Sequence, residues 1–176
     1  MAHIKITTLN INGLPSPTKV AMLAEFIPLQ EIDILLVQEV TKPVLHDIHS
    51  YNTHYNIGAT MRGTAIITRD SISLENVTML PSGRAITAKF RQIWIINIYA
   101  PSGTARKQDR KKFYNNEVPY IIATAGDHIL LGGDYLNEPQ EPALTPANQK
   151  PLQWGDGARR KPSSGLITTH IPRYSV

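Results

Sequence analysis

Oxygen-bearing side chains stand where several apolar stretches of this chain end. The candidates for chemistry are Asn10, Asn12, Glu39, Tyr99 and Asp134. The chain has no cysteine, which excludes disulfides, zinc-thiolate sites and thiol nucleophiles. Carboxylate and amide oxygens suit Mg2+, which usually takes one or two carboxylates together with the phosphate oxygens of a substrate. The residue types therefore favour phosphoester chemistry assisted by Mg2+, with Mn2+ as the alternative cation.

Each of these residues also has an ordinary structural interpretation when it is taken alone. Asn10 and Asn12 precede Gly13 and could be turn formers. Glu39 could mark the point where a strand meets water, and Asp134 could belong to a plain Gly-Gly-Asp turn. Only their combination, at the ends of separate strands, favours a shared site.

Short strands, interrupted by glycine and proline, must position these side chains. Alternating or continuous apolar character predicts strands at 3–9, 32–37, 51–57, 64–68, 72–79, 84–90, 92–98 and 128–132. One helix is predicted after an N-cap at Thr18, and another over 104–125 with a kink or restart at Pro119. Strand ends at one edge of an α/β sheet converge, so the polar side chains are expected to share one cleft.

Five segments, in order along the chain, resemble motifs of the endonuclease/exonuclease/phosphatase superfamily. They are Leu9-Asn10-Ile11-Asn12-Gly13-Leu14, Val37-Gln38-Glu39, Arg62-Gly63-Thr64-Ala65-Ile66, Asn97-Ile98-Tyr99-Ala100-Pro101 and Leu131-Gly132-Gly133-Asp134. The fourth motif and the stretch 113–117 look most like endonuclease domains of non-LTR (LINE-type) retrotransposons. The resemblance implies an α/β fold, a four-layer sandwich of two packed mixed sheets with outer helices, as a partial domain over residues 1–137.

The resemblance also implies a role for each matching residue. Glu39 would bind the metal, and Asn10 would support both the metal and the scissile phosphate. Tyr99 would contact the phosphate, Asp134 would orient or deprotonate the attacking water, and Asn12 would bind substrate. The implied reaction is in-line attack of water on a DNA phosphodiester, which leaves a 3′-hydroxyl and a 5′-phosphate.

Two departures concern the last catalytic elements of the family. The family has an asparagine two residues after Asp134, where this chain has Leu136, so Asn137 is the nearest catalytic candidate and is displaced by one place. The family also ends with a late Asp and a Ser-Asp-His motif, to which neither Asp156 nor His170 corresponds. We therefore expect a fold that is incomplete at the C-terminus, through truncation or a frameshift, and impaired nuclease activity.

The character of the chain changes near residue 137. Residues 138–176 hold six of the thirteen prolines and little periodic apolar pattern. This composition predicts an irregular, proline-rich tail in which only 166–167 and 171 could be strand fragments.

A basic run in the second predicted helix begins with Arg106 and Lys107. The plainer interpretation is a solvated helix face, and the alternative is a strip that binds substrate phosphates. The net charge of +4 would help a DNA partner to associate. We see no signal peptide and no apolar run long enough to span a membrane, so we expect an intracellular protein, nuclear if it acts on genomic DNA.

Three functional hypotheses remain open from the sequence. The first is a Mg2+-dependent DNA endonuclease of retrotransposon type. The second is an abasic-site nuclease or another phosphoesterase of the same superfamily, because substrate loops set such specificity. The third is a non-catalytic relic that at most binds nucleic acid. The sequence gives no indication of the oligomeric state.

Overall fold

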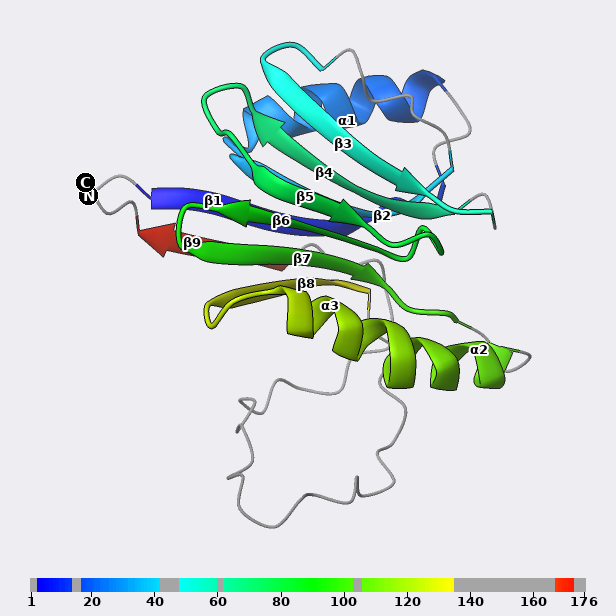
Figure 1. Ribbon diagram of the computed structural model, residues 1–176. Helices are drawn as coiled ribbons and strands as arrows, with labels where there is room; N and C mark the ends of the chain where they lie inside the picture. Colours follow the sequence, from blue (N-terminus) through cyan, green and yellow to red (C-terminus); the bar gives the residue numbers. More distant parts are fainter. Residues whose placement is uncertain are drawn as a thin grey trace, which may run out of the picture.

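Two mixed β-sheets pack face to face, with helices on both outer surfaces (Figure 1). The computed structural model describes residues 3–13, 17–41, 48–59, 62–102, 106–134 and 167–172. The order of layers is helix, sheet, sheet, helix, which confirms the four-layer α/β sandwich expected from the sequence. No helix within the described ranges is long and apolar enough to cross a membrane.

The first sheet has the strand order β3-β4-β2-β1-β9. Its strands are β1 (His3–Asn10), β2 (Ile34–Val40), β3 (Tyr51–Ile57), β4 (Gly63–Arg69) and β9 (Ile167–Pro172). Strands β1 and β2 are parallel, so the chain must cross over between them, and α1 (Pro17–Leu29) provides that crossover. Every residue of β2 is buried, as expected for a central strand covered on both faces.

The second sheet has the strand order β5-β6-β7-β8. Its strands are β5 (Glu75–Met79), β6 (Ala85–Phe90), β7 (Ile93–Tyr99) and β8 (Ile129–Asp134). Strands β7 and β8 are also parallel, and the crossover between them is the second helical region. The predicted strand over 72–79 is shorter than expected, because it begins only at Glu75.

The second helical region is interrupted where the sequence predicts it. It consists of α2 (Lys107–Lys112), a π-helical turn η2 (Phe113–Glu117) and α3 (Val118–Thr124). The Val118 N–H donates to the carbonyl of Phe113, five residues earlier, and Pro119 follows in the first turn of α3. Proline has no N–H to donate, so this first turn is the place where the helix tolerates it. The predicted restart at Pro119 is confirmed.

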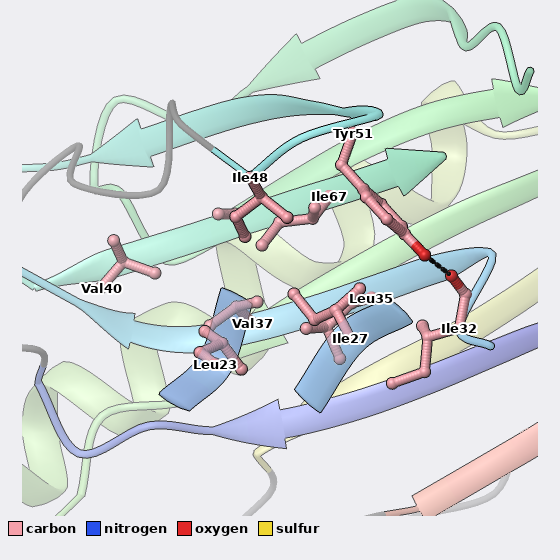
Figure 2. Close-up of a cluster of buried hydrophobic side chains, with 10 residues drawn as sticks. Leu23, Ile27, Ile32, Leu35, Val37, Val40, Ile48, Tyr51 and Ile67 are labelled. Atoms are coloured by element: carbon pink, nitrogen blue, oxygen red, sulfur yellow. Dashed lines mark hydrogen bonds between the residues drawn. The ribbon is translucent and has the colours of Figure 1, made fainter. Parts of the chain in front are cut away.

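Three apolar layers hold the sandwich together. The layer between α1 and the first sheet contains Leu23, Ile27, Leu35, Val37, Val40, Ile48, Ala65 and Ile67 (Figure 2). The layer between the two sheets contains Ile4, Ile6, Ile34, Leu36, Ile66, Ile86, Ala88 and Ile95. The layer between the second sheet and its helices contains Ala85, Ile96, Ile98, Phe113 and Ile121. Each buried Ile or Leu contributes about 1.5–3 kcal/mol, so these layers fix how the sheets lie against each other.

One expectation from the sequence needs correction. Helix α1 begins at Pro17, so Thr18 lies in its first turn and is not its N-cap. In the tail, the possible strand fragments at 167 and 171 fall within β9 (Ile167–Pro172), which pairs antiparallel with β1. This pairing joins segments more than 150 residues apart, and local patterning carries no information about it. The rest of the predicted tail lies outside the described residues.

Candidate active site

The candidate residues lie at one end of the space between the two sheets. Every second residue of a strand faces the same side. On β1, Ile4 and Ile6 pack between the sheets, and the same alternation turns Asn10 toward that space. On β7, the last side chain that faces the space between the sheets is that of Tyr99. On β8, it is that of Asp134. Strand alternation therefore brings three of the candidates to one edge of the sandwich.

Glu39 reaches the same edge only because β2 is irregular. Val37 packs under α1, and strict alternation would turn Glu39 to that side as well. Instead, the β2–β4 register shifts between Gln38 and Val40, and Glu39 has a φ of 62°. A bulge of this kind re-aims side chains and is common beside active sites. Val40 consequently packs under α1, and the Glu39 carboxylate turns toward Asn10.

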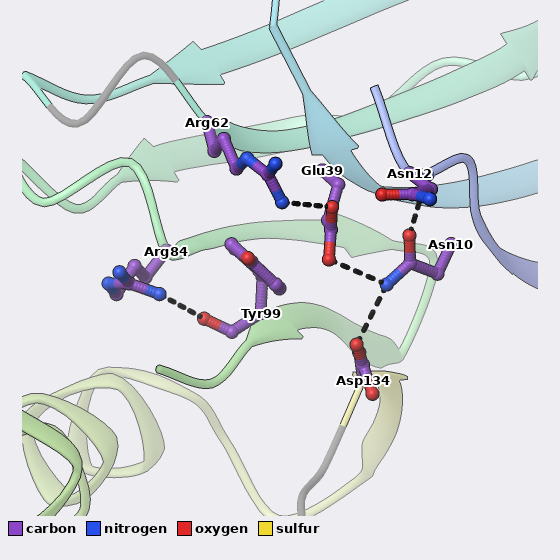
Figure 3. A network of polar contacts seen from close by, with 7 residues as sticks. All are labelled: Asn10, Asn12, Glu39, Arg62, Arg84, Tyr99 and Asp134. Atoms are coloured by element: carbon purple, nitrogen blue, oxygen red, sulfur yellow. Dashed lines mark hydrogen bonds and ion pairs between the residues drawn. The ribbon is translucent and has the colours of Figure 1, made fainter. Parts of the chain in front are cut away.

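The amide of Asn10 joins the two candidate carboxylates (Figure 3). Its Nδ2 donates to Oε1 of Glu39 at 3.2 Å and to Oδ2 of Asp134 at 2.7 Å. Its Oδ1 accepts the backbone N–H of Asn12 at 2.8 Å, which fixes the orientation of the amide. Two carboxylates at one donor atom would repel each other, and the shared amide offsets part of that repulsion.

The second Glu39 oxygen is paired with an arginine from the neighbouring strand. Nη1 of Arg62, the residue before β4, lies 2.5 Å from Oε2 of Glu39. A side-chain hydrogen bond with Tyr99, followed by the attraction of Glu39, raises the pKa of Arg62 above its usual value. Arg62 therefore links the metal-ligand candidate to the phosphate-contact candidate.

Tyr99 is fixed by a second arginine. The guanidinium of Arg84 stacks over the Tyr99 ring at 5.1 Å from its centroid, and Nη1 donates to the Tyr99 carbonyl at 3.3 Å. Both residues are buried. This stacking holds the ring at the end of β7, with its face toward Arg84 (Figure 3).

A buried polar bridge beneath the site ties the two sheets together. Nε2 of Gln38 donates to Oδ1 of Asn97 at 2.7 Å and to Oγ1 of Thr8 at 2.9 Å. Nδ2 of Asn97 donates to the carbonyls of Val37 and Ala65, each at 2.9 Å. Gln38 and Asn97 are 1% and 0% exposed, so their polar groups must be satisfied internally. Each precedes a site residue by one or two positions, and the bridge therefore positions Glu39 and Tyr99.

The donor set suits a hard cation that completes its shell with substrate oxygens. Among the described residues, no three or more His, Cys, Asp or Glu side chains are placed to hold a metal. Two carboxylates, Glu39 and Asp134, share the Asn10 amide, and Mg2+ needs no more when phosphate oxygens and water supply the rest. The Asn10 oxygen accepts the Asn12 backbone N–H and keeps a second lone pair, so Asn10 organises the carboxylates and stays a predicted metal ligand beside Glu39.

The structure brings four predicted site residues together, namely Asn10, Glu39, Tyr99 and Asp134. Asn12 joins them through its backbone N–H, and its side chain is exposed. Arg106 and Lys107 are exposed at the start of the second helical region, and neither bonds to this cluster in the described part of the chain. Asn137 lies outside the described residues.

Sequence reasoning gave no role to the two arginines and did not predict that the amides of Gln38 and Asn97 pair between the sheets. Arg62 lies in a quoted motif, but its charge received no role, and nothing in the local sequence predicts that Arg84 stacks on Tyr99. Gln38 and Asn97 sit in apolar strands, and a buried amide within such a strand is the signal that could have indicated an internal partner.

Comparison with solved structures identifies the architecture. No protein-family profile matches the chain. An AP endonuclease from Archaeoglobus fulgidus matches with a TM-score of 0.61 and 23% identity, over 74% of this chain and 56% of its own. A 3′-5′ exonuclease (NExo) from Neisseria meningitidis matches with a TM-score of 0.63 and 20% identity, over 75% and 57%. The D. rerio TDP2 complexed with a single-strand DNA product matches with a TM-score of 0.60 and 17% identity, over 76% and 61%.

The chain has the endonuclease/exonuclease/phosphatase fold. At these identities the likeness concerns the arrangement of sheets and helices, as the sequence motifs predicted. The matched region spans less than two thirds of each of these three structures.

Proposed function

We propose that this chain is a metal-dependent phosphodiesterase that nicks DNA. The observation that carries the proposal is the Asn10 amide, which gathers the Glu39 and Asp134 carboxylates at one end of the inter-sheet space. The solved structures with this fold include an AP endonuclease, a 3′-5′ exonuclease and a protein complexed with a DNA product, which supports DNA as the substrate. The net charge of +4 favours a polyanionic partner.

Each residue of the site has a proposed role that follows from the chemistry of its side chain. Glu39, supported by Asn10 and Asp134, would hold Mg2+ or Mn2+, which stabilises negative charge that develops on a phosphate when it is bound. Asp134 accepts a proton from the attacking water, which forms a new P–O bond as the bond from phosphorus to the 3′ oxygen breaks. The 3′ oxygen takes up a proton from solvent water and leaves as a hydroxyl, the 5′ phosphate remains, and Asp134 returns its proton to solvent.

We further propose that the enzyme is of non-LTR retrotransposon type. The support is the Asn97-Ile98-Tyr99-Ala100-Pro101 motif, of which Asn97 fixes the inter-sheet bridge and Tyr99 faces the site. Such an enzyme would act on genomic DNA in the nucleus.

A supercoiled-plasmid nicking assay with Mg2+ tests the proposal. Wild-type protein should convert supercoiled plasmid to open circles, and EDTA should abolish the conversion. Asp134→Asn should lower the rate about 10²–10⁴-fold, because it removes the proton acceptor for water. Glu39→Gln should require more Mg2+, because it removes a negative ligand.

The matched control is Glu75→Gln, the same chemical change at an exposed position of β5. It should nick like the wild type. Nicking by Asp134→Asn at the wild-type rate, together with an unchanged Mg2+ requirement in Glu39→Gln, would reject the assignment. Absence of nicking together with retained, salt-sensitive DNA binding would favour the non-catalytic relic.

A further inference from the structure

Arg62 places a cation against Glu39, the residue proposed to bind a metal. Its Nη1 lies 2.5 Å from Oε2, and the other carboxylate oxygen accepts from Asn10. Both oxygens of Glu39 are therefore engaged. The Arg62 side chain is 49% exposed, while that of Glu39 is 11% exposed. The arginine reaches inward from the solvent side to a carboxylate that is fixed in the protein.

The Arg62 side chain can move away from this ion pair, whereas the Glu39 side chain is held in place. Half-exposed ion pairs are worth at most about 1 kcal/mol, so water readily replaces Glu39 around the guanidinium. Glu39 is held by a strand bulge and by the Asn10 amide. A divalent cation that binds Glu39 would displace Arg62 and not the carboxylate.

The change in charge on cation binding indicates that the displaced Arg62 guanidinium would move to a phosphate of the substrate. Without a cation, the charges of Glu39 and Asp134 cancel those of Arg62 and Arg84, so the cluster does not attract a phosphodiester. A bound divalent cation makes the formal charge of the cluster positive, which attracts one. A guanidinium is also well shaped to bind two phosphate oxygens at once.

We propose that Arg62 is a cation-gated phosphate-binding residue: it holds Glu39 until a divalent cation binds, and then turns to the DNA backbone. This inference rests on the proposed function and assigns a substrate-binding role to a residue outside the predicted site. Tyr99, which also bonds to Arg62, would guide the guanidinium toward the phosphate.

Cation binding without DNA is the first test. Electron paramagnetic resonance measures the concentration of free Mn2+ as the cation is titrated into wild type, Arg62→Gln and Arg91→Gln. Arg62→Gln should bind Mn2+ about fivefold more tightly, because the cation no longer competes with a guanidinium for Glu39. Arg91→Gln makes the same charge change at the opposite end of β7 and should leave Mn2+ binding unchanged.

DNA binding is the second test, and it should change in the opposite direction. Fluorescence anisotropy measures the affinity for a labelled duplex with Ca2+, which takes the same oxygen ligands, and with EDTA. Arg62→Gln should weaken binding in Ca2+ and reduce the slope of log K against log salt by about 0.9, the value of one phosphate contact. In EDTA the loss of affinity should be smaller and the salt slope unchanged, because Arg62 is then paired with Glu39 and makes no phosphate contact. Arg62→Lys should compete with Mn2+ as the wild type does but bind DNA less tightly, because it lacks the planar fork.

The outcomes separate this inference from the proposed function. Wild type that binds Mn2+ and nicks DNA, with Arg62→Gln unchanged in both titrations, would overturn the role of Arg62 alone. Equal loss of DNA affinity in Ca2+ and in EDTA would also overturn it, because a permanent DNA contact needs no cation. Wild type that neither binds Mn2+ nor nicks DNA would overturn both.

Discussion

The side-chain amide of Asn10 has two functions in this site. Asn10 donates two hydrogen bonds through one nitrogen and accepts one through its oxygen, so it positions both carboxylates and is itself fixed. An aspartate at this position would add a third negative charge and could not donate. An amide, and not an acid, is therefore the side chain that lets Glu39 and Asp134 approach each other before a cation binds.

Tyr51 supplies a pH-dependent contribution to stability at the residue scale. Its hydroxyl donates to the Ile32 carbonyl at 2.9 Å (Figure 2). Burial raises the pKa of the Tyr51 phenol, an effect that Arg69 opposes and Asp33 reinforces. Below the unfolded pKa of about 10 both states are protonated, and the full contribution is present. As the pH rises toward the folded pKa, the unfolded chain ionises first and stability falls.

We predict that Tyr51→Phe lowers stability by about 0.5–1.5 kcal/mol near neutral pH, through loss of this hydrogen bond. The difference from wild type should shrink at about pH 11, because phenylalanine cannot ionise. Urea unfolding of wild type and Tyr51→Phe, near neutral pH and at about pH 11, measures this difference in stability. Tyr120→Phe, at an exposed residue of α3, is the control and should show no change with pH. An equal Tyr51→Phe effect at both pH values would contradict the prediction.

At the scale of elements, the site depends on strand ends that depart from ideal geometry. Glu39 lies at a bulge of β2, and Gly133 of β8 has a φ of 146° just before Asp134. A Cβ on Gly133 would lie 2.0 Å from the Ile98 carbonyl oxygen of β7. Glycine is therefore required for β8 to pair closely with β7 and to present Asp134 at the edge.

We predict that Gly133→Ala lowers stability by about 1–3 kcal/mol or more, because it adds both a strained φ and a backbone clash. Nicking should fall as Asp134 moves. Thermal unfolding and the plasmid assay measure the two effects. Gly126→Ala is the matched control, since its Cβ would meet only the Trp94 side chain at 3.1 Å. Similar melting temperatures for the two variants would show that the β8 backbone tolerates a side chain.

At the scale of the whole molecule, the two edges of the second sheet differ. At one edge, β5 exposes mainly polar residues, such as Glu75 and Thr78, together with one apolar residue, Met79. At the other, β8 exposes Ile129 and Leu131, which are 39% and 38% accessible in the described part of the chain. An apolar strand at a sheet edge can pair with another chain, whereas charged or polar edge residues discourage pairing.

We predict that the protein self-associates through β8 as its concentration rises, and that Ile129→Lys combined with Leu131→Lys suppresses this. Lysine on an edge strand adds charge and costs little where the side chain is already partly exposed. Sedimentation velocity over a range of concentrations measures the effect. Thr78→Lys together with Met79→Lys adds the same two charges at exposed positions of β5 and should leave the association unchanged. Association that survives the β8 substitutions would assign it to another surface.

The sequence by itself determined the elements and the direction of most site residues. The period of two along the strands turns Asn10, Tyr99 and Asp134 inward, and proline restarts a helix at Pro119, because both effects act between neighbours in the chain. The order of five motifs was enough to indicate the fold that the structure confirms.

Only the tertiary structure decided which residues of the site contact one another. The bulge that turns Glu39 depends on its pairing with β4, and Arg62 meets that carboxylate because the start of β4 lies beside the end of β2. The pairing of β9 with β1 likewise joins distant segments. Such contacts depend on which strands become neighbours, and that choice is made by burial of the whole core and not by any local pattern.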